Sequence, residues 1–375
     1  MLGELLVKRT GTVDPSKYPD EMFDLYSIPA YDRGVPDLIA GCEIGSAKQV
    51  VQPGDVLLSR IVPHIRRAWV VGSEDGRRII ASGEWMVFRS QDIYPRWLRH
   101  MFLGDRFHQQ FMATVAGVGG SLMRARPSHV ANIEIPFPSH PEQRRIAAIL
   151  DHADALRDKR RRVIGHFDEL TQSTFIEMFG DPMADSIHKC PLGAVGDVIT
   201  GNTPSRANPL NFGDGIEWIK SDNLGGTIAT AAEERLSATG RQTARVVPGG
   251  SVLVACIAGS PSSIGKASLV DREVAFNQQI NAVVPGSTID SRFLLEQLKV
   301  APELVRQQST GGMKGLVSKS NFASIRVMVP PLDHQRRFAN FVAEVDDVRE
   351  REAAALTVTD NLFESLRSRA FSGQL

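Results

Sequence analysis

Residues 138–146 read Pro-Ser-His-Pro-Glu-Gln-Arg-Arg-Ile, and residues 330–338, which lie 192 positions later, read Pro-Pro-Leu-Asp-His-Gln-Arg-Arg-Phe. At the same offset Leu170 falls on Leu362 and Phe179 on Phe371. Self-similarity at a fixed spacing indicates that one structural unit occurs more than once. A spacing of 192 residues is too long for a solenoid repeat, so the chain is interpreted as a duplicated half-molecule.

The repeat extends upstream of this stretch. Gly119-Gly120 falls on Gly311-Gly312, and Pro53-Gly-Asp-Val-Leu-Leu resembles Pro248-Gly-Gly-Ser-Val-Leu-Val with a shift of three or four residues. The order is therefore domain, helix, domain, helix. The predicted segments are a first domain, a first helix, a second domain and a second helix, over residues 1–137, 138–180, 181–329 and 330–375.

The two helices carry apolar residues at heptad spacing, from Ile149 to Met178 in the first copy. Pro141 suits a first helical turn, and Gly180-Asp-Pro182 ends the helix. A helix over about 141–179 would be about 57 Å long. Two copies from one duplication would most simply pack antiparallel. The charged run Arg157–Arg162 is interpreted as a solvated helix face, in preference to a DNA contact.

The two globular stretches contain short apolar runs bounded by Gly, Pro, Asn and Asp, which predict strands. Helices are expected near 95–113 and 290–308. The sequence therefore predicts an α+β fold, in which two α+β domains are separated by two long antiparallel helices. These helices would form a coiled-coil-like spacer, and the whole would show a pseudo-two-fold internal duplication.

Charge and cysteine content narrow the functional classes. The 375 residues include 43 basic and 43 acidic side chains, a net charge of zero that argues against a histone-like binder. The three cysteines, Cys42, Cys190 and Cys256, are far apart, so a reducing, cytosolic setting is expected. No signal peptide is predicted, and the longest apolar run, near 252–258, is too short to span a bilayer.

Motifs for catalysis are not found. Residues 259–266, Gly-Ser-Pro-Ser-Ser-Ile-Gly-Lys, have one residue too many between the glycines for a phosphate-binding loop, and Ala267 follows where a hydroxyl is needed. Paired histidines for zinc are absent, as is the Asn/Asp-Pro-Pro-aromatic motif of enzymes that methylate exocyclic amines. These absences point to a chain that is not itself an enzyme and carries no cofactor or metal.

Polar and basic clusters point to nucleic acid instead. Residues 60–100 hold eight arginines against four acids, and arginine suits bidentate recognition of guanine and phosphate. About half of these arginines are expected to form surface ion pairs instead. The candidate DNA-binding residues in the first domain are Arg60, Arg66, Arg67, Arg77 and Arg78. Those in the second domain are Thr203, Ser205, Arg206, Lys220, Asn277, Gln278 and Lys314. For residues 277–279, Asn-Gln-Gln, a buried amide network that braces two loops is an equally good interpretation.

Several motifs together resemble a known family. Ile133-x-Ile-Pro136, Pro141-Glu-Gln-Arg-Arg-Ile-Ala-Ala-Ile-Leu-Asp151 and Phe175-Ile-Glu-Met-Phe-Gly-Asp-Pro182 resemble the central region of type I restriction-modification specificity (S) subunits. The closing Ser365-Leu-Arg-Ser-Arg-Ala-Phe-Ser-Gly-Gln-Leu375 is similar to the end of such chains. The resemblance is weaker in the first globular domain, which opens with residues 11–29 in place of a Thr-Pro-Ser loop.

The resemblance implies a non-catalytic, cytoplasmic prokaryotic protein with two target-recognition domains that read a bipartite site in double-stranded DNA. Its helices would act as a ruler and bind methyltransferase subunits, two in number, with an endonuclease subunit joining for restriction. S-adenosylmethionine would bind to the methyltransferase, and ATP and Mg to the endonuclease. The residues expected on the partner-binding helices are Gln143, Arg144, Arg145, Gln335, Arg336 and Arg337.

Two alternatives remain at this point. A stand-alone DNA-binding regulator could use duplicated domains to read an inverted repeat, although the Glu-Gln-Arg-Arg stretch at 142–145 favours the first interpretation. A scaffold could organise proteins through its long helices, and the arginines of residues 60–100 argue against it.

Overall fold

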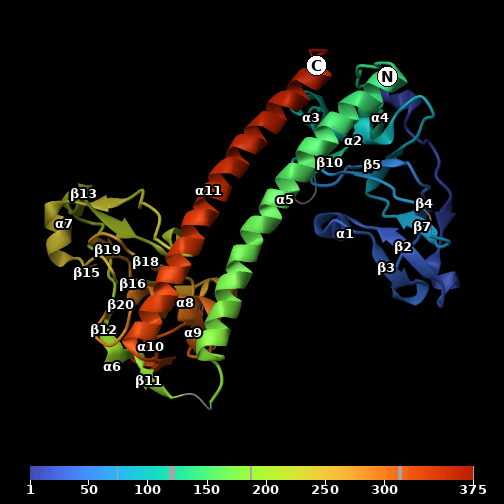
Figure 1. Ribbon diagram of the computed structural model, residues 1–375. Coiled ribbons are helices and arrows are strands. Elements are labelled where there is room, and N and C mark those ends of the chain that lie inside the picture. The colour runs from blue at the N-terminus through green and yellow to red at the C-terminus, as the bar shows by residue number, and fades with distance from the viewer. Residues whose placement is uncertain (74, 118–122, 186–187, 311–314, 375) are drawn as a thin grey trace. The chain divides into compact units, whose positions relative to one another are not determined.

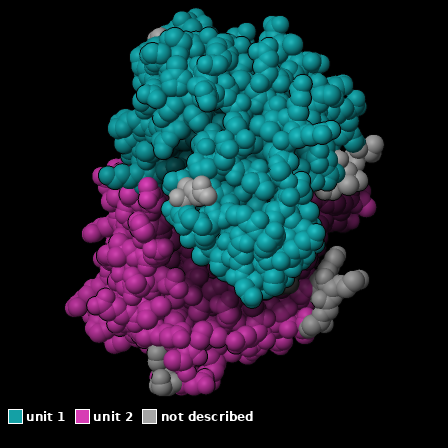
Figure 2. Space-filling view, turned by 90° about the vertical axis from the view of Figure 1, so that its right-hand side faces the viewer, with its two compact units in different colours: residues 1–161, 354–375 teal, residues 162–353 magenta. Residues whose placement is uncertain are grey.

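The computed structural model describes residues 1–73, 75–117, 123–185, 188–310 and 315–374 (Figure 1). The chain divides into two compact units, which Figure 2 colours separately. The first unit combines Met1–Arg161 with Ala354–Leu375, and the second is Arg162–Ala353. The glycine pairs 119–120 and 311–312 of the repeat lie outside the described residues.

Two helices of 40 residues each, α5 (His140–Phe179) and α11 (Leu332–Phe371), run antiparallel and contribute to both units (Figure 1). The first matches the helix expected over about 141–179. Gly180 follows it at φ +85°, a left-handed conformation that glycine adopts without a steric penalty and that ends the helix.

The first unit holds two main sheets, with strand orders β1-β4-β7-β2-β3 and β6-β5-β8, and a β9–β10 pair. Its strands are β1 Thr12–Val13, β2 Met22–Tyr26, β3 Asp37–Ala40, β4 Lys48–Val50, β5 Val56–Ser59, β6 Ala68–Val70, β7 Arg78–Ala81, β8 Trp85–Phe88, β9 Val115–Ala116 and β10 Arg124–Ala125. Its shorter helices are α1 Ile28–Arg33, α2 Pro95–Leu103, α3 Asp105–Met112 and α4 Pro127–Val130.

The second unit holds sheets of order β12-β20-β16-β18 and β14-β13-β19-β15, with the pairs β17–β21 and β11–β22. Its strands are β11 Lys189–Pro191, β12 Gly196–Thr200, β13 Phe212–Ile219, β14 Arg235–Leu236, β15 Val246–Val247, β16 Val252–Ala255, β17 Ile257–Ala258, β18 Ala267–Leu269, β19 Val274–Phe276, β20 Ile280–Pro285, β21 Gly315–Leu316 and β22 Arg326–Met328. Its shorter helices are α6 Leu192–Val195, α7 Ala238–Thr243, α8 Ser291–Val300, α9 Glu303–Arg306 and α10 Lys319–Ser324.

The duplication is visible element by element. The β6-β5-β8 sheet of the first unit corresponds to β18-β16-β20 of the second, and each is followed by three short helices and then a long one. The helices expected near 95–113 and 290–308 are the pairs α2–α3 and α8–α9, each broken at its middle by Gly104 or by Ala301-Pro302. The predicted α+β fold with two long antiparallel helices is confirmed.

The apolar stripe of the long helices does not form one continuous seam. In α5, Ile146 and Leu150 are buried in the core of the first unit, and Phe175 is buried in the core of the second. Leu156 and Leu170, expected in the seam, are instead 46% and 43% exposed. The helix buries apolar residues where a globular domain covers it, and its middle carries charged side chains toward the other helix.

Candidate nucleic-acid interface

The arginines of residues 60–100 are neutralised within the first unit. All eight make ion pairs with acids, where about half were expected to. The pairs are Arg60–Glu84, Arg66–Asp105, Arg67–Asp32, Arg77–Asp24, Arg78–Glu21, Arg89–Asp55, Arg96–Asp151 and Arg99–Asp154. Most of the acids come from segments distant in sequence. This stretch therefore does not present an unpaired basic face.

Arg67 requires a correction. Its side chain is only 10% exposed and donates two hydrogen bonds to Asp32, at 2.8 and 2.9 Å. A buried, bidentate arginine holds its own domain together and cannot reach a base or a phosphate. The arginines at 60, 66, 77 and 78 are about one-third exposed, so they would have to exchange a carboxylate for a phosphate to contact DNA.

One of these carboxylates is shared. Glu84 accepts hydrogen bonds from Arg124 (2.9 Å) and Arg60 (3.1 Å). The hydrogen bond from Arg124, with the charge of Arg60 adding to it, lowers the pKa of Glu84. The carboxylate therefore stays ionised and holds β10 against the loop that follows β5.

That loop, residues 60–66, is a feature that the sequence patterns did not reveal. Val62 has φ +48°, a conformation that a β-branched residue rarely adopts and that costs free energy. It is held there because its N–H donates to Met123 O at 3.1 Å. Ile65, at the tip, is 44% exposed. The corresponding place in the second unit follows β16 and begins with β17, which pairs with β21.

In the second unit the predicted polar loops do come together. The Asn202 N–H donates to Phe276 O at 3.1 Å, and the Thr203 hydroxyl donates to Gln278 Oε1. Gly201 allows this approach, because a Cβ there would lie 2.2 Å from Asn277 O. The loop after β12 and the loop before β20 thus form one polar surface.

Two cations border this surface. Arg206 donates two hydrogen bonds to Glu234 (2.9 and 3.0 Å), and the Lys220 Nζ lies 2.6 Å from the same carboxylate. The hydrogen bond from Arg206 holds the pKa of Glu234 below its ordinary value. Both cations lie over the ring of Trp218, at 5.5 and 5.2 Å from its centroid. The three charged groups leave one net positive charge.

Asn277 is a buried residue and not a surface one. It is buried, and its side chain bonds to Gln279 through both amide atoms, at 2.9 and 3.0 Å. For Asn277 the structure therefore agrees with a buried amide contact, which lies within the loop of residues 277–279. Gln278 and Ser205 are exposed and available for contacts. Lys314 lies outside the described residues.

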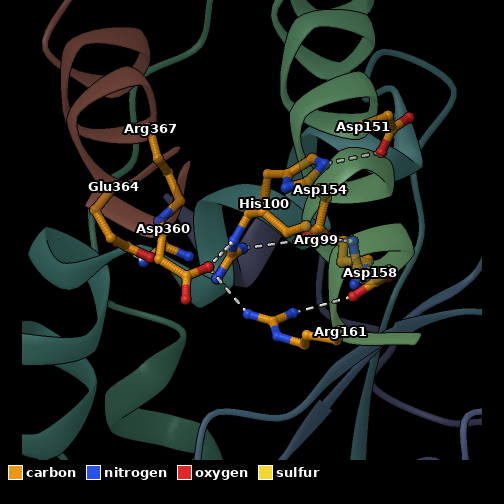
Figure 3. Close-up of polar contacts among 10 residues, drawn as sticks. Arg99, His100, Asp151, Asp154, Asp158, Arg161, Asp360, Glu364 and Arg367 are labelled. Atoms are coloured by element: carbon orange, nitrogen blue, oxygen red, sulfur yellow. Dashed lines mark hydrogen bonds and ion pairs between the residues drawn. The ribbon is translucent and has the colours of Figure 1, made fainter. Parts of the chain in front are cut away.

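A network of ion pairs joins the first domain to both long helices within the first unit (Figure 3). Asp151 on α5 accepts from Arg96 (2.9 Å) and lies 2.8 Å from the buried His100 ring on α2. Arg157 on α5 donates to Asp154 at 2.9 Å and to Asp360 on α11 at 2.5 Å. The Arg157 guanidinium also lies 4.1 Å from the centroid of the Phe363 ring.

The second unit repeats the helix-to-helix part of this network. Arg349, 192 residues after Arg157, lies 2.9 Å from Asp346 and donates to Asp168 at 3.0 Å. Asp346 and Asp168 correspond to Asp154 and Asp360 at the same offset. The same arginine therefore fixes the register of the antiparallel helices once in each unit.

Known proteins resemble this chain in one domain and in the overall fold. The protein-family model of the type I restriction modification DNA specificity domain matches residues 187–357 of the sequence. The specificity subunit of the type I restriction enzyme HindI from Haemophilus influenzae is 29% identical over 145 residues, which are 37% of this chain and 31% of that protein. The match thus spans about a third of the length of the curated relative.

Two solved structures share the fold. One, from a study of complex assembly and conformational transition of the type I R-M system, is 23% identical with a TM-score of 0.60, and the likeness covers 100% of this chain and 97% of that chain. The other, the type I restriction-modification S subunit from M. genitalium, is 12% identical with a TM-score of 0.58, covering 99% and 94%. Residues 187–357 therefore resemble a type I restriction modification DNA specificity domain, and the whole chain shares the fold of these two structures.

The two glutamines of the repeated Gln-Arg-Arg motif are buried and connect the long helices to the domains. Gln143 accepts from the Tyr94 N–H (2.7 Å) and donates to Asp92 O (3.1 Å) and Pro138 O (3.0 Å). Gln335 makes the same three bonds in the second unit, to Asp290 N, Thr288 O and Pro330 O. Both side chains are fully buried, so they are not surface residues that a partner could contact. They lock each long helix onto the domain that precedes it.

The four arginines of the two Gln-Arg-Arg motifs are exposed. Arg144 lies 5.7 Å from the centroid of the Tyr94 ring, and Arg145 pairs with Glu142 at 2.7 Å. Arg336 and Arg337 are exposed, and neither forms an ion pair with another residue in the described part of the chain. They are the motif residues that remain free for a partner.

Within the described ranges, no group of three or more His, Cys, Asp or Glu side chains could hold a metal ion. Over the same residues, no helix is both long and apolar enough to cross a membrane.

Proposed function

We propose that this chain is the DNA-reading subunit of a type I restriction-modification complex and that each of its two domains reads one half of a bipartite site. The observation that carries the proposal is the duplication: two domains with matching elements, each followed by a 40-residue helix, in a chain of which residues 187–357 match the specificity domain. Two readers on one polypeptide suit two half-sites separated by unspecified base pairs.

In the second domain, the proposed reading surface is the joined loop pair. Gln278 and Ser205 offer an amide and a hydroxyl to base edges, while Arg206 and Lys220 contact phosphates. Glu234 holds both cations in place beforehand, so that little side-chain entropy is lost on binding. A near-neutral surface of this kind favours discrimination over tight non-specific binding, which matches the net charge of zero.

The long helices act as the ruler between the half-sites. Arg157 and Arg349 each tie one helix to the other, which prevents the helices from sliding past each other. Because an α-helix rises 1.5 Å per residue, a fixed register translates into a fixed distance between readers.

Methyltransferase subunits are the proposed partners of the outer helix faces. Seven large apolar side chains on the described part of these helices are exposed, and four of them form two pairs that are each related by the 192-residue offset. The pairs are Leu156 (46%) with Val348 (41%), and Leu170 (43%) with Leu362 (57%). Exposed apolar residues in equivalent places suit two copies of the same partner. These faces also favour a subunit of a complex over a stand-alone regulator. An endonuclease subunit would join the assembly for restriction.

Catalysis is assigned to the partners. S-adenosylmethionine would bind the methyltransferase subunits, and ATP and Mg the endonuclease subunit, while this chain binds none of them. Isothermal titration of the purified chain with S-adenosylmethionine tests this assignment. No heat of binding is expected, and saturable binding would contradict it.

Selection of bound sequences from a random DNA pool tests the reading function, using the chain co-purified with its methyltransferase. We expect two conserved half-sites with a constant gap. Gln278→Ala with Ser205→Ala should weaken the base preference in one half-site and leave the other unchanged, because both residues lie on the second domain. A matched control, Arg144→Ala, should leave both half-sites intact. A weaker base preference in both half-sites of the loop variants would refute the assignment of one domain to each half-site.

A further inference from the structure

Matching hydrogen bonds identify equivalent positions in the two domains. The Ser82 N–H donates to Tyr26 O at 3.0 Å in the first domain, and the Asn277 N–H donates to Ile219 O at 3.0 Å in the second. In each domain the donor follows the end of one strand, and the acceptor ends the parallel strand beside it. The loop that begins at Ser82 is therefore the counterpart of the loop that begins at Asn277, which is one half of the joined loop pair.

The other half of that loop pair also has a counterpart in the first domain. The Val7 N–H donates to Val87 O at 2.9 Å, at the place where β12 pairs with β20 in the second domain. Residues 8–11 therefore correspond to residues 200–203, the loop after β12, and the offset is again 192 residues. Residues 8–11 and 82–84 are called the first loop pair.

Gln49 joins the two halves of the first loop pair. Its side chain accepts from the Thr10 hydroxyl at 3.1 Å and donates to Ser82 O and to Trp85 O, both at 2.8 Å. In the second domain the two loops contact each other directly, through the Thr203 hydroxyl. The first domain thus has a continuous surface at the place where the second domain has its proposed reading surface.

The first loop pair is basic. Lys8 and Arg9 are exposed, and neither forms an ion pair with another of the described residues. Glu84, the only acid of the pair, is shared by Arg60 and Arg124, whose nitrogens lie 3.1 and 2.9 Å from it. These five side chains leave three net positive charges, whereas the cations that border the second domain's surface leave one.

Arg77, in contrast, belongs to an ion pair that both domains share. It donates to Asp24 at 3.0 Å, and Arg272 donates to Glu217 at 2.6 Å in the second domain. Both arginines lie five residues before the N–H donor that follows the strand, and both acids lie two residues before its acceptor. An ion pair that recurs at equivalent positions is part of the common fold. The cations that remain available to a phosphate are therefore those of the first loop pair.

We infer that the first domain binds DNA phosphates through Lys8 and Arg9, on the surface formed by the first loop pair. The inference rests on the proposed function, because it gives the first domain a DNA-facing surface equivalent to that of the second. A cation without an acid partner binds a phosphate without breaking an ion pair, and binding releases counterions from the DNA. Phosphate contacts position a protein on DNA and carry no sequence information. The first domain thus supplies the larger share of the salt-dependent affinity.

The salt dependence of DNA binding tests this inference, using the chain co-purified with its methyltransferase. The probe is a fluorescein-labelled pool of duplexes of random sequence, and fluorescence anisotropy measures the affinity. Each phosphate contact contributes about 0.9 to the slope of log affinity against log salt, so Lys8→Gln with Arg9→Gln should lower that slope by about 1.8. Between about 50 and 200 mM salt, the wild-type complex should therefore lose about 12-fold more affinity than the variant.

Two controls separate a local role from general effects of charge and folding. Lys17→Gln with Arg106→Gln removes the same charge from exposed positions of the same unit outside the first loop pair, and should leave the slope unchanged. Lys8→Arg with Arg9→Lys keeps the charge and should keep the slope. A slope that the glutamine variant of Lys8 and Arg9 does not lower, or that the control at Lys17 and Arg106 lowers equally, overturns the inference.

Failure of the proposed function has a different signature. The wild-type complex would then bind the pool but enrich no sequence from it, whatever the slope of its salt dependence. A wild-type complex that does not bind the pool at all would overturn both the proposed function and the inference.

Discussion

Replacement of Arg157 by glutamine should destabilise the first unit far more than the equivalent change at Arg349 destabilises the second. The Arg157 side chain is only 13% exposed and bonds to Asp154 and Asp360, whose side chains are 23% and 37% exposed. Its guanidinium also packs on Phe363. Arg349 pairs with Asp168, which is 74% exposed, so solvent already screens that interaction.

The magnitude follows from these contacts. A hydrogen bond between charged groups contributes about 1.5–3 kcal/mol, and a partly buried cation–π contact about 1 kcal/mol. Asp154 and Asp360 keep Arg99 and Arg161 as partners, which limits the cost of leaving them behind. We therefore expect Arg157→Gln to lower the free energy of unfolding by about 2–3 kcal/mol, against about 1 kcal/mol for Arg349→Gln.

Urea unfolding followed by tryptophan fluorescence measures both changes, because three of the four tryptophans lie in the first unit and Trp218 in the second. A double-mutant cycle of Arg157→Gln with Asp360→Asn should give a coupling energy of about 1–2 kcal/mol. Arg337→Gln, at an exposed position, is the control and should leave stability unchanged. A coupling energy near zero, or a larger loss from Arg349→Gln than from Arg157→Gln, would refute the reasoning.

Three further predictions concern other parts of the chain. Gln143→Leu and Gln335→Leu should each lower the free energy of unfolding in urea by about 2–4 kcal/mol, because each leaves one buried N–H and two carbonyls without a partner. A loss below about 0.5 kcal/mol would contradict the role of the buried glutamines. In the folded chain a maleimide at pH 8 should label the exposed Cys42 but not Cys256, since burial raises the pKa of the Cys256 thiol to about 12. Mass spectrometry of the labelled peptides measures this, and modification of Cys256 without urea would contradict the prediction. Burial alone would raise the pKa of Asp151, but hydrogen bonds from His100 and Arg96 outweigh it and the pKa is lowered from 3.8. The contribution of Asp151 to stability is therefore complete above the ordinary carboxyl range and is lost as the pH falls below about 3.8. Asp151→Asn should therefore reduce the loss of unfolding free energy at acid pH. An unchanged dependence on acid pH would exclude this role.

The repeat and the helices could be predicted because their signals are local. The Gln-Arg-Arg motif and the heptad spacing lie in single stretches of chain, and α5 begins and ends where Pro141 and Gly180 indicate. The fold class followed from the same patterns.

The state of the candidate site residues could not be predicted, because their partners are distant in sequence. The acid that neutralises Arg78 is Glu21, and the acid that pairs with the buried Arg67 is Asp32. A count of charges over residues 60–100 cannot include either. The burial of Gln143 likewise depends on Tyr94 and Asp92, which only the tertiary fold brings to it.

The central claim is that this chain selects a bipartite DNA site through two domains at a fixed separation. Methylome sequencing tests it most directly, in cells that express a methyltransferase partner with or without the chain. The prediction is a new methylated motif with two specific half-sites and a constant gap, which appears only when the chain is present. A methylation pattern that does not change with the chain, or a single uninterrupted motif, would contradict the claim.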